Sequence, residues 1–428
     1  MILHYRFRQL SSLGLIALTG FAVFAFGAVD SFTVTIIQVA LAALAIAWAI
    51  RKVRHPYPFV ASAFYLPLLV IVVAADVQTA FSLSAFAHVT EAGLALWLSY
   101  LAFFVIGVNV QADPSIRKTW PVAACWLGLA AGLMAMLQAV AARGGVLWRA
   151  APGHEPFGPF ADFEHYAVFA ELLFPLSLVT ALASSRWRAL GVAAAAVLAA
   201  SAAAAGSSTG FLLLTAELVI ILIVEAVKLA LERGKNPGRI VSSAGALGLV
   251  AGALVAGGII RQLAQEGPDL PVSDASAPAA AWQLFQQKKA IGHGLGTFPV
   301  AARAHFPEMT EASLAGAEPL RLIAELGIAG VVAQLLLIGL LPIMARTRRA
   351  WLGGVLALAA AWAHSWHYAW LGSPALVLVA LGLLALVATD GDRLPLKAIF
   401  RRRSVMDIAT HSHQNQSPQR AYQPSSAE

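Results

Sequence analysis

The chain has 428 residues, of which 59% are hydrophobic and only 12% are charged. A soluble domain carries about 25% charged residues, so this composition excludes an ordinary water-soluble protein. The formal net charge of +7 does not indicate a nucleic-acid-binding surface, because the basic residues form short clusters between apolar runs. The single cysteine, Cys125, excludes an intramolecular disulfide and a cysteine-based metal cluster.

Apolar runs of about 20 residues recur along the chain, and this is the length that a helix needs to cross a bilayer. The first run, residues 13–29, is longer than the core of a typical signal peptide, so we expect an uncleaved span there. The sequence predicts an all-α, polytopic membrane protein with about twelve transmembrane helices. These are residues 11–29, 32–50, 59–77, 90–110, 119–142, 166–183, 189–205, 209–231, 240–260, 319–344, 351–368 and 374–389.

The distribution of Lys and Arg predicts how the spans are oriented. With both termini in the cytoplasm, the inner segments hold 22 of the 29 Lys and Arg residues, and the short outer turns hold none. Basic inner loops are the usual pattern of membrane proteins. We therefore expect a multi-pass protein whose two long loops face outward, to the periplasm if it lies in a bacterial inner (plasma) membrane. These loops are residues 143–165 and 261–318, the second lying between the ninth and tenth spans.

Composition also divides the chain into domains. Residues 1–392 form the predicted transmembrane domain, and residues 393–428 form a cytoplasmic tail. After residue 403 the tail is polar and poor in apolar residues, which is typical of disorder. Residues 193–205 are almost all small, and small residues let helices approach closely in lipid. We therefore expect the span 189–205 to lie inside the bundle.

The longer outer loop contains a predicted helix followed by a glycine-rich stretch. Residues 279–290 place Trp282 and Phe285 on one face, with Lys288 and Lys289 near the end. Such a helix either meets anionic headgroups at the membrane surface or packs on the bundle. The stretch IGHGLGTF has glycines at 292, 294 and 296. Glycine permits tight turns and close backbone approach, but this spacing is not a nucleotide-binding fingerprint.

Charged residues gather where this loop enters the tenth predicted span. They are Arg303, His305, Glu308, Glu311, Glu318 and Arg321. Ionisable residues at the mouth of a span point to function. If Pro319 opens a helix, Glu318 suits its N-terminus. Arg321 either pairs with Glu325, four residues along the same helix, or binds an anion in a wet cavity. His305 is either a general base or an ordinary loop histidine.

Two further groups contain residue types that can carry chemistry. The smaller outer loop holds His154, Glu155, Asp162, Glu164 and His165. Their spacing is not that of a zinc motif, so we expect no metal there. His364 and His367 are three residues apart, which places them on one helical face near the outer end of the eleventh predicted span, among Trp and Tyr residues. This pattern indicates an interfacial aromatic belt or, alternatively, side chains that line a cavity.

Three stretches resemble the O-antigen ligase and polymerase superfamily of bacterial inner-membrane glycan transferases. They are FGPFADFEHYAVFAELLFPLSL at the sixth span, Trp282 followed by IGHGLGTF, and AEPLRLIAELGIAG at the tenth span. In the last stretch Leu320, Glu325, Gly327 and Gly330 are in register with the family signature. The resemblance implies transfer of a glycan from undecaprenyl pyrophosphate to the lipid A core or to another polysaccharide acceptor. It also implies arginines around the pyrophosphate, a histidine as base, and no metal or cofactor.

On this resemblance, the candidate catalytic residues are His305, Glu318 and Arg321. The candidate substrate-binding residues are Arg303, His165, Glu164, Lys288 and Lys289. Expected partners are the lipid-linked glycan, its acceptor and membrane lipids, with no nucleic acid. Pyrophosphate is already a good leaving group, so cationic stabilisation and one base suffice for the reaction.

The chain departs from the family pattern at several positions. Phe163 stands in place of an arginine, and Ser208-Thr209-Gly210 stands where Ser-Arg-Gly is usual. Pro278 replaces another frequent arginine, and Gly316 replaces the histidine before the tenth span. Either the site is rebuilt from other residues, or the chain keeps the fold with an altered or lost activity.

Two alternatives to a glycosyltransferase therefore remain. The first is a non-catalytic member of the family that binds lipid-linked glycan or scaffolds polysaccharide assembly. The second is a transporter. The chain has no evident internal repeat and no ionisable residue clearly at the membrane midplane, although Glu171 and Glu217 lie within predicted spans.

Overall fold

A computed structural model gives the arrangement of these features. It describes residues 2–56, 58–141, 156–231, 237–264, 277–307, 309, 314, 316–344 and 352–389. Several sequence-based expectations lie outside this range. They concern the tail and the loop residues His154, Glu155, Glu308 and Glu311. The described residues form helices and no β-strand, as the sequence predicts.

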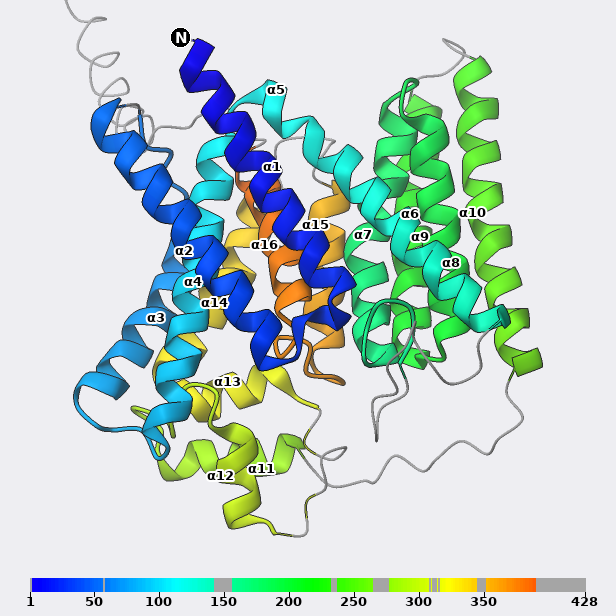
Figure 1. The fold of residues 1–428 in the computed structure, drawn as a ribbon. Coiled ribbons are helices and arrows are strands. Elements are labelled where there is room, and N and C mark those ends of the chain that lie inside the picture. The colour runs from blue at the N-terminus through cyan, green and yellow to red at the C-terminus, as the bar shows by residue number, and fades with distance from the viewer. Residues whose placement is uncertain are drawn as a thin grey trace, which may run out of the picture. The chain divides into compact units, whose positions relative to one another are not determined.

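The helices follow one another along the chain as Figure 1 shows. Their bounds are α1 Ile2–Phe24, η1 Phe26–Ala28, α2 Ser31–Arg54, α3 Tyr65–Ala80, α4 Ala87–Gln111, α5 Pro114–Arg117, α6 Thr119–Ala141, α7 Phe163–Ala183, α8 Arg188–Ala205, α9 Ser208–Leu231, α10 Pro237–Ala264, α11 Ala277–Gln287, α12 Phe298–His305, α13 Glu318–Leu326, α14 Ile328–Met344, α15 Leu352–His364 and α16 Pro374–Thr389.

Length and composition make this chain a helical, multi-pass membrane protein. In the described part of the chain, seven helices are long and apolar enough to cross a membrane: α1, α2, α4, α6, α7, α8 and α9. Shorter apolar helices stand at the other five predicted spans: α3, α10, α14, α15 and α16. The number of twelve spans therefore stays a prediction.

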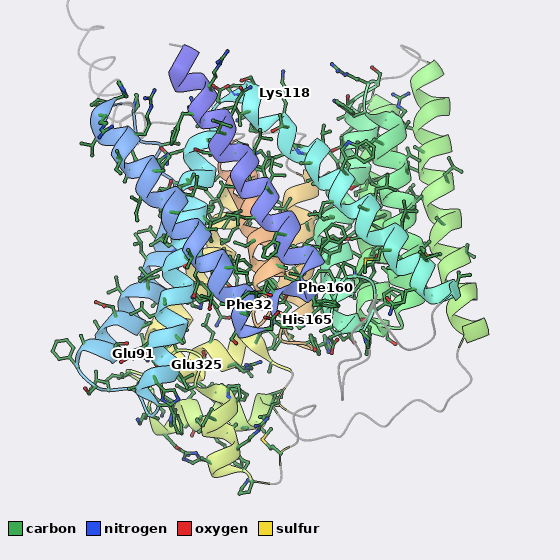
Figure 2. The ribbon with its side chains drawn as sticks, viewed as in Figure 1. Phe32, Glu91, Lys118, Phe160, His165 and Glu325 are labelled. Carbon is green, nitrogen blue, oxygen red and sulfur yellow. The ribbon has the colours of Figure 1, made fainter. Side chains whose placement is uncertain are left out.

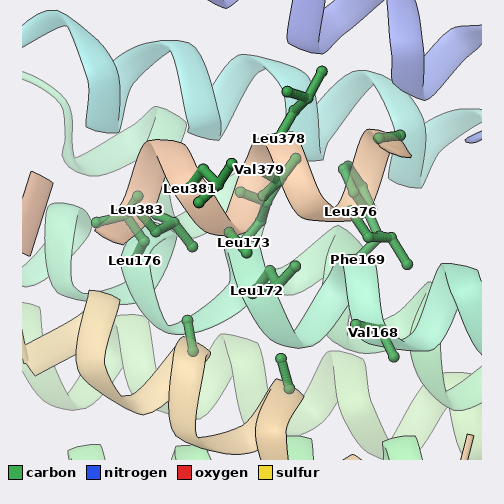
Figure 3. Packing of buried hydrophobic residues seen from close by; sticks show 14 of the residues in the cluster. Val168, Phe169, Leu172, Leu173, Leu176, Leu376, Leu378, Val379, Leu381 and Leu383 are labelled. Atoms are coloured by element: carbon green, nitrogen blue, oxygen red, sulfur yellow. The ribbon is translucent and has the colours of Figure 1, made fainter. Parts of the chain in front are cut away.

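The helices α7 and α16 form the centre of the bundle. Every residue from Tyr166 to Leu178 of α7 is buried, and so is every residue from Pro374 to Val387 of α16. A helix that is apolar on all sides is buried on all sides. Figure 3 shows Phe169, Leu173 and Leu176 of α7 facing leucine and valine side chains of α16. Any polar group on α7 therefore lies deep inside the protein.

The outer helix α2 presents an apolar stripe away from the bundle. Phe32, Val39, Ile46 and Val53 are spaced by seven residues, and their exposed fractions are 74%, 64%, 61% and 80%. Water does not tolerate such a long exposed stripe in a soluble monomer. Hydrocarbon does, because lipid tails are as apolar as these side chains. The stripe thus supports the assignment of α2 as a lipid-facing helix.

The small residues of α8 allow close packing, as expected. The helix contacts α6, α7 and α10, and its buried side carries Ala194, Ala195, Leu198, Ala199, Ala202 and Ala203. At Gly257 of α10, an added Cβ would lie 2.1 Å from the carbonyl oxygen of Ala200. The prediction that the span 189–205 lies inside the bundle is confirmed for its packing.

The tenth predicted span, residues 319–344, is wrong as a single helix. The chain breaks at Gly327, whose φ of 62° and ψ of −137° interrupt the helix between α13 and α14. In Figure 1, α13 is turned away from the direction of α14 at the end of the bundle that also carries α11 and α12. We call this end the loop face. Apolar residues of α13, among them Leu320, Leu322 and Leu326, adjoin the apolar run of α14, so the sequence prediction joined the two helices into one span.

The glycine-rich stretch explains where the break lies. His293 N donates to Ala324 O at 3.0 Å, Gly294 N donates to Glu325 O at 3.0 Å, and Ile328 N donates to Lys289 O at 2.9 Å. The loop backbone therefore satisfies the carbonyl groups at the end of α13, which would otherwise lack partners. The expected role of the glycines in close backbone approach is confirmed.

Gln78 of α3 fastens this loop to the bundle. Its Nε2 donates to Ile291 O at 2.6 Å and to Glu325 O at 2.8 Å, and its Oε1 accepts from Leu295 N at 3.1 Å. One buried side chain thus joins the loop, the end of α13 and a membrane helix.

A matched pair of glycine substitutions tests this junction. Gly292 and Gly296 have φ of +78° and +77°, so alanine at either position costs about 1–2 kcal/mol of left-handed strain. An added Cβ at Gly292 would also lie 2.2 Å from the carbonyl oxygen of Glu325, whereas at Gly296 its nearest neighbour would be 3.7 Å away. We expect Gly292→Ala to lower the melting temperature clearly more than Gly296→Ala, measured by thermal denaturation in detergent. Equal effects of the two variants would contradict the described packing.

Candidate functional site

The N-terminus of α13 is anchored on the segment between α15 and α16. Ala317 N donates to Trp366 O at 3.2 Å, and Glu318 N donates to Ser365 O at 2.9 Å. The Glu318 carboxylate accepts from Leu371 N at 3.0 Å. The helix begins at Glu318 with Pro319 in its first turn, as predicted. The mouth of α13 is therefore held at three points.

Of the two alternatives for Arg321, the ion pair with Glu325 does not form among the described residues, although the two charges interact electrostatically. The Glu325 carboxylate instead accepts from Gly296 N at 2.9 Å and from Phe298 N at 3.0 Å, so it caps α12. Backbone amides at a helix N-terminus attract a carboxylate as strongly as a side-chain cation does. Glu325 therefore has a structural role in this arrangement.

The guanidinium of Arg321 can therefore interact with an anionic ligand. Its guanidinium lies over the Phe298 ring at 5.0 Å, and Nε is buried without a hydrogen-bond partner among the described residues. Among the same residues, it forms no ion pair with Glu318 or Glu325. A half-buried cation stacked on an aromatic ring, with an unsatisfied N–H group, is well suited to bind an anion.

A large apolar cavity opens beside the mouth of α13. Its volume is about 500 Å³, and helices α3, α4, α13, α14, α15 and α16 line it. Glu318 and Ser365 stand at its loop-face end, while Leu341, Pro342 and Leu384 line it farther into the bundle. From residue 333 to residue 342, α14 runs about 14 Å along the wall. The size is in the usual range of ligand pockets, about 300–1,000 Å³.

The remaining candidates in the long loop lie around α11 and α12. Lys288 and Lys289 are exposed just after α11, and Arg303 and His305 are exposed at the end of α12. His305 Nδ1 lies 2.8 Å from Ala301 O, and its ring is edge-on to that of His293 at 6.1 Å. Seven residues of helix, about 10 Å, separate His305 from Phe298, on which Arg321 stacks. His305 is therefore set apart from the mouth of α13.

The predicted amphipathic helix at 279–290 is present as α11. The Trp282 and Phe285 rings are 5.4 Å apart, so these residues share a face as expected. Ala277, Ala280, Ala281 and Leu284 are buried, and α11 packs on α13. Of the two readings of this helix, packing on the protein fits the structure.

Glu164 and His165, at the start of α7, lie on the same loop face. Glu164 Oε2 is 3.2 Å from His364 Nε2, and the His165 ring is edge-on to that of Tyr368 at 5.3 Å. Figure 2 shows His165 and Glu325 toward the loop face and Lys118 at the opposite end. The expectation that His364 and His367 share one helical face is wrong, because α15 ends at His364. His364 is buried, whereas His367 is exposed.

Tyr368 lies between the start of α7, which carries Glu164, and the start of α13, which carries Glu318. It interacts electrostatically with Asp162, Glu164 and Glu318. Burial raises the pKa of the Tyr368 phenol well above its usual value, and these carboxylates raise it further. The hydroxyl therefore keeps its proton near neutral pH and is a hydrogen-bond donor at the loop face.

Sequence reasoning missed three important side chains. Gln78 falls one residue beyond the third predicted span, Tyr368 sits at the end of the eleventh, and His293 lies between two glycines. A polar residue at the edge of an apolar run was the only signal for Gln78. Nothing local indicated that it would meet a loop more than 200 residues away.

Comparisons of the chain with protein-family models, curated proteins and solved structures gave no match. The residues that the structure describes also contain no group of three or more His, Cys, Asp or Glu side chains placed to hold a metal ion. The chemistry of the site must therefore be argued from its own geometry.

The pH dependence of the loop gives a test of the contacts of His293. Burial lowers the pKa of His293, and the neutral ring lies with Nε2 2.9 Å from Leu284 O. The unfolded loop binds the proton more tightly, so stability falls as pH drops through the ordinary histidine pKa of about 6.5. We expect the melting temperature to fall between about pH 7.5 and pH 5.5, and His293→Gln to flatten this fall. His88→Gln, at an exposed histidine of α4, should leave it unchanged; a loss of slope in that control and not in His293→Gln would contradict the assignment.

Proposed function

We propose that this protein is a membrane glycosyltransferase of the O-antigen ligase type. It would transfer a glycan from undecaprenyl pyrophosphate to the lipid A core or another polysaccharide acceptor. The observation that carries this proposal is the apolar cavity that ends at Glu318, beside the helix that presents Arg321. A ligand that fits has a long apolar chain and an anionic head. A polyprenyl pyrophosphate has both.

Each part of the ligand has a counterpart in the site. The apolar chain would lie along α14, between Ala333 and Pro342. The pyrophosphate would meet the N-terminal end of α13 and the guanidinium of Arg321, because helix N-termini and arginine both favour phosphate. Exposed Lys288, Lys289 and Arg303 would extend the positive potential of the loop face toward the incoming donor.

Glu318 is the better placed of the two candidate bases. It lies one helical turn from Arg321 on the same helix, whereas His305 sits at the far end of α12. Burial raises the pKa of the Glu318 carboxyl, and Arg321 and the Leu371 amide counteract this rise. In the reaction, an acceptor hydroxyl attacks the anomeric carbon and gives its proton to the Glu318 carboxylate. The bond to pyrophosphate breaks, and Arg321 stabilises the departing charge.

The orientation of the protein belongs to the same proposal. Basic turns gather with the N-terminus at the end opposite the loop face, where Arg8 is paired with Asp113 at 3.4 Å. Such turns favour the cytoplasm. The loop face would then be periplasmic, in a bacterial inner membrane, where lipid-linked glycans are presented for transfer.

A non-catalytic binder remains the second candidate, and the test separates the two. In a strain deleted for the gene, we expect the wild-type chain to restore a missing surface polysaccharide on a gel. Arg321→Ala and Glu318→Gln should not restore it at matched membrane levels, because loss of one charge-stabilising group costs about 100-fold or more in rate. Arg186→Ala, at the exposed start of the segment before α8, is the matched control and should restore it.

A binding assay completes the test. Purified wild-type protein should bind undecaprenyl pyrophosphate more tightly than undecaprenol, and Arg321→Ala should remove the difference. If the protein binds the pyrophosphate but Glu318→Gln still restores the polymer, the chain is a binder and not the transferase. If deletion changes no polymer and undecaprenyl pyrophosphate does not bind, the proposal is wrong.

A further inference from the structure

Three ionisable side chains meet where α15 packs on α7. His364 Nδ1 lies 2.7 Å from Oε1 of Glu171, and His364 Nε2 lies 3.2 Å from Oε2 of Glu164. His364 and Glu171 are fully buried, whereas the side chain of Glu164 is 21% exposed. The imidazole therefore joins a carboxyl inside the bundle to a carboxyl that reaches the loop face.

Glu217 of α9 extends this cluster. It is 3% exposed, and neither of its carboxyl oxygens has a hydrogen-bond partner among the described residues. The second oxygen of Glu171 also has none among them. The two carboxyls interact electrostatically, and α9 is close to Glu171: an added Cβ at Gly210 would be 3.3 Å from its Oε1.

The cluster lies deep in the membrane region. Glu171 is eight residues from the start of α7, and Glu217 is nine residues from the start of α9. At 1.5 Å per residue these distances are about 12–14 Å, close to the middle of a hydrocarbon core of about 30 Å. The sequence left the depth of Glu171 and Glu217 open, and counted from the ends of α7 and α9 both lie near the midplane. Ionisable residues at this depth are expensive and mark the paths of ions or protons.

Apart from the His364 imidazole, the surrounding helices bring no cation to these carboxyls among the described residues. Neither Glu171 nor Glu217 has an ion pair with a Lys or Arg side chain in the described part of the chain. Of the titratable groups nearby, Cys125 of α6 lies near Ser177 and Thr180, and Tyr166 of α7 forms a hydrogen bond with Ser201 of α8. The described span of α16 carries no ionisable residue, and Glu225 of α9 pairs with Lys228 toward the opposite end. At the loop face, Glu164 is accompanied by Asp162 and Tyr368.

We propose that Glu171, Glu217 and His364 form a proton-binding site within the membrane, which exchanges protons with the loop face through Glu164. An ionised carboxylate with no cation or donor is very unfavourable in an apolar interior. A bound proton removes the charge, and it fits where the structure leaves carboxyl oxygens without partners. The proposal does not depend on glycan transfer.

The hydrogen-bond geometry defines one exchange step. The O–H proton of Glu171 moves to Nδ1 of His364, while the proton on Nε2 moves to the Glu164 carboxylate. Glu164 then releases that proton to water at the loop face. The imidazole stays neutral throughout and ends with its proton on the other nitrogen, and Glu171 is left as a carboxylate that can take a proton from Glu217. Histidine suits this task because both ring nitrogens can give or take a proton near neutral pH.

Infrared spectroscopy of the full chain in lipid nanodiscs tests the proposal, with the proton itself as the probe. At neutral pH we expect the carbonyl-stretching band of a protonated carboxyl. Glu217→Gln should remove part of the intensity of this band. Glu171→Gln should change the band of Glu217 or the dependence of that band on pH. Glu217→Asp, which keeps the carboxyl, should restore a shifted band and guards against a variant that fails to fold. Glu91→Gln, at an exposed carboxyl of α4, should leave the band unchanged.

The route is tested by exchange with heavy water. His364→Gln should keep the band of Glu217 but slow its shift in heavy water at least tenfold, because the path through Glu164 is cut. An unchanged rate in His364→Gln contradicts the route. A band that is the same in wild type, Glu171→Gln, Glu217→Gln and Glu91→Gln overturns the site, whatever the outcome of the polysaccharide experiment.

Discussion

The candidate site depends on the set of hydrogen bonds that closes the C-terminal end of α13. There, backbone carbonyls that would otherwise be unsatisfied are taken by the glycine-rich loop and by Gln78 of α3. The carboxylate of Glu325, on α13, in turn accepts hydrogen bonds from the backbone at the N-terminus of α12. Because these bonds join α3, α11, α12 and α13, the long loop is part of the folded core and not a loose excursion from it. Arg321 keeps its position on Phe298 only as long as this closure holds.

The central pair of α7 and α16 sets a second constraint. Both helices are buried on all sides, so a charged residue on either of them has no route to solvent except through a neighbouring side chain. Glu171 of α7 meets this constraint through His364. Glu217 is also buried, on the neighbouring α9, and has no such partner among the described residues. Structural packing alone gives no reason to keep two carboxyls here, since hydrophobic residues of similar size would pack at lower cost.

Much of the helical framework could be predicted from the sequence, because hydropathy reports directly whether a segment belongs in lipid. The break at Gly327 could not, since it arises from contacts with residues 289–294 and not from the local pattern. The role of the three glycines was predictable, as their freedom at positive φ is a local property. The partners of Arg321, Glu325 and His364 were not: helical spacing suggested Arg321 with Glu325, whereas the amides of a distant loop bind that carboxylate more favourably. The Glu171 and His364 contact joins positions 193 residues apart, and no periodicity signals it.

The way in which α13 is held has a mechanical consequence. Its C-terminal end is hydrogen-bonded to the glycine-rich loop. At its N-terminal end, Glu318 N donates to the carbonyl oxygen of Ser365, the residue that follows His364. Hydrogen bonds thus hold α13 at both ends, and those at its N-terminal end involve the residue next to the buried His364. A helix of nine residues does not bend to absorb a displacement. A reorientation of His364 that shifts the end of α15 would therefore move Glu318, and α13 with it, as a rigid unit through the backbone hydrogen bond between Ser365 and Glu318.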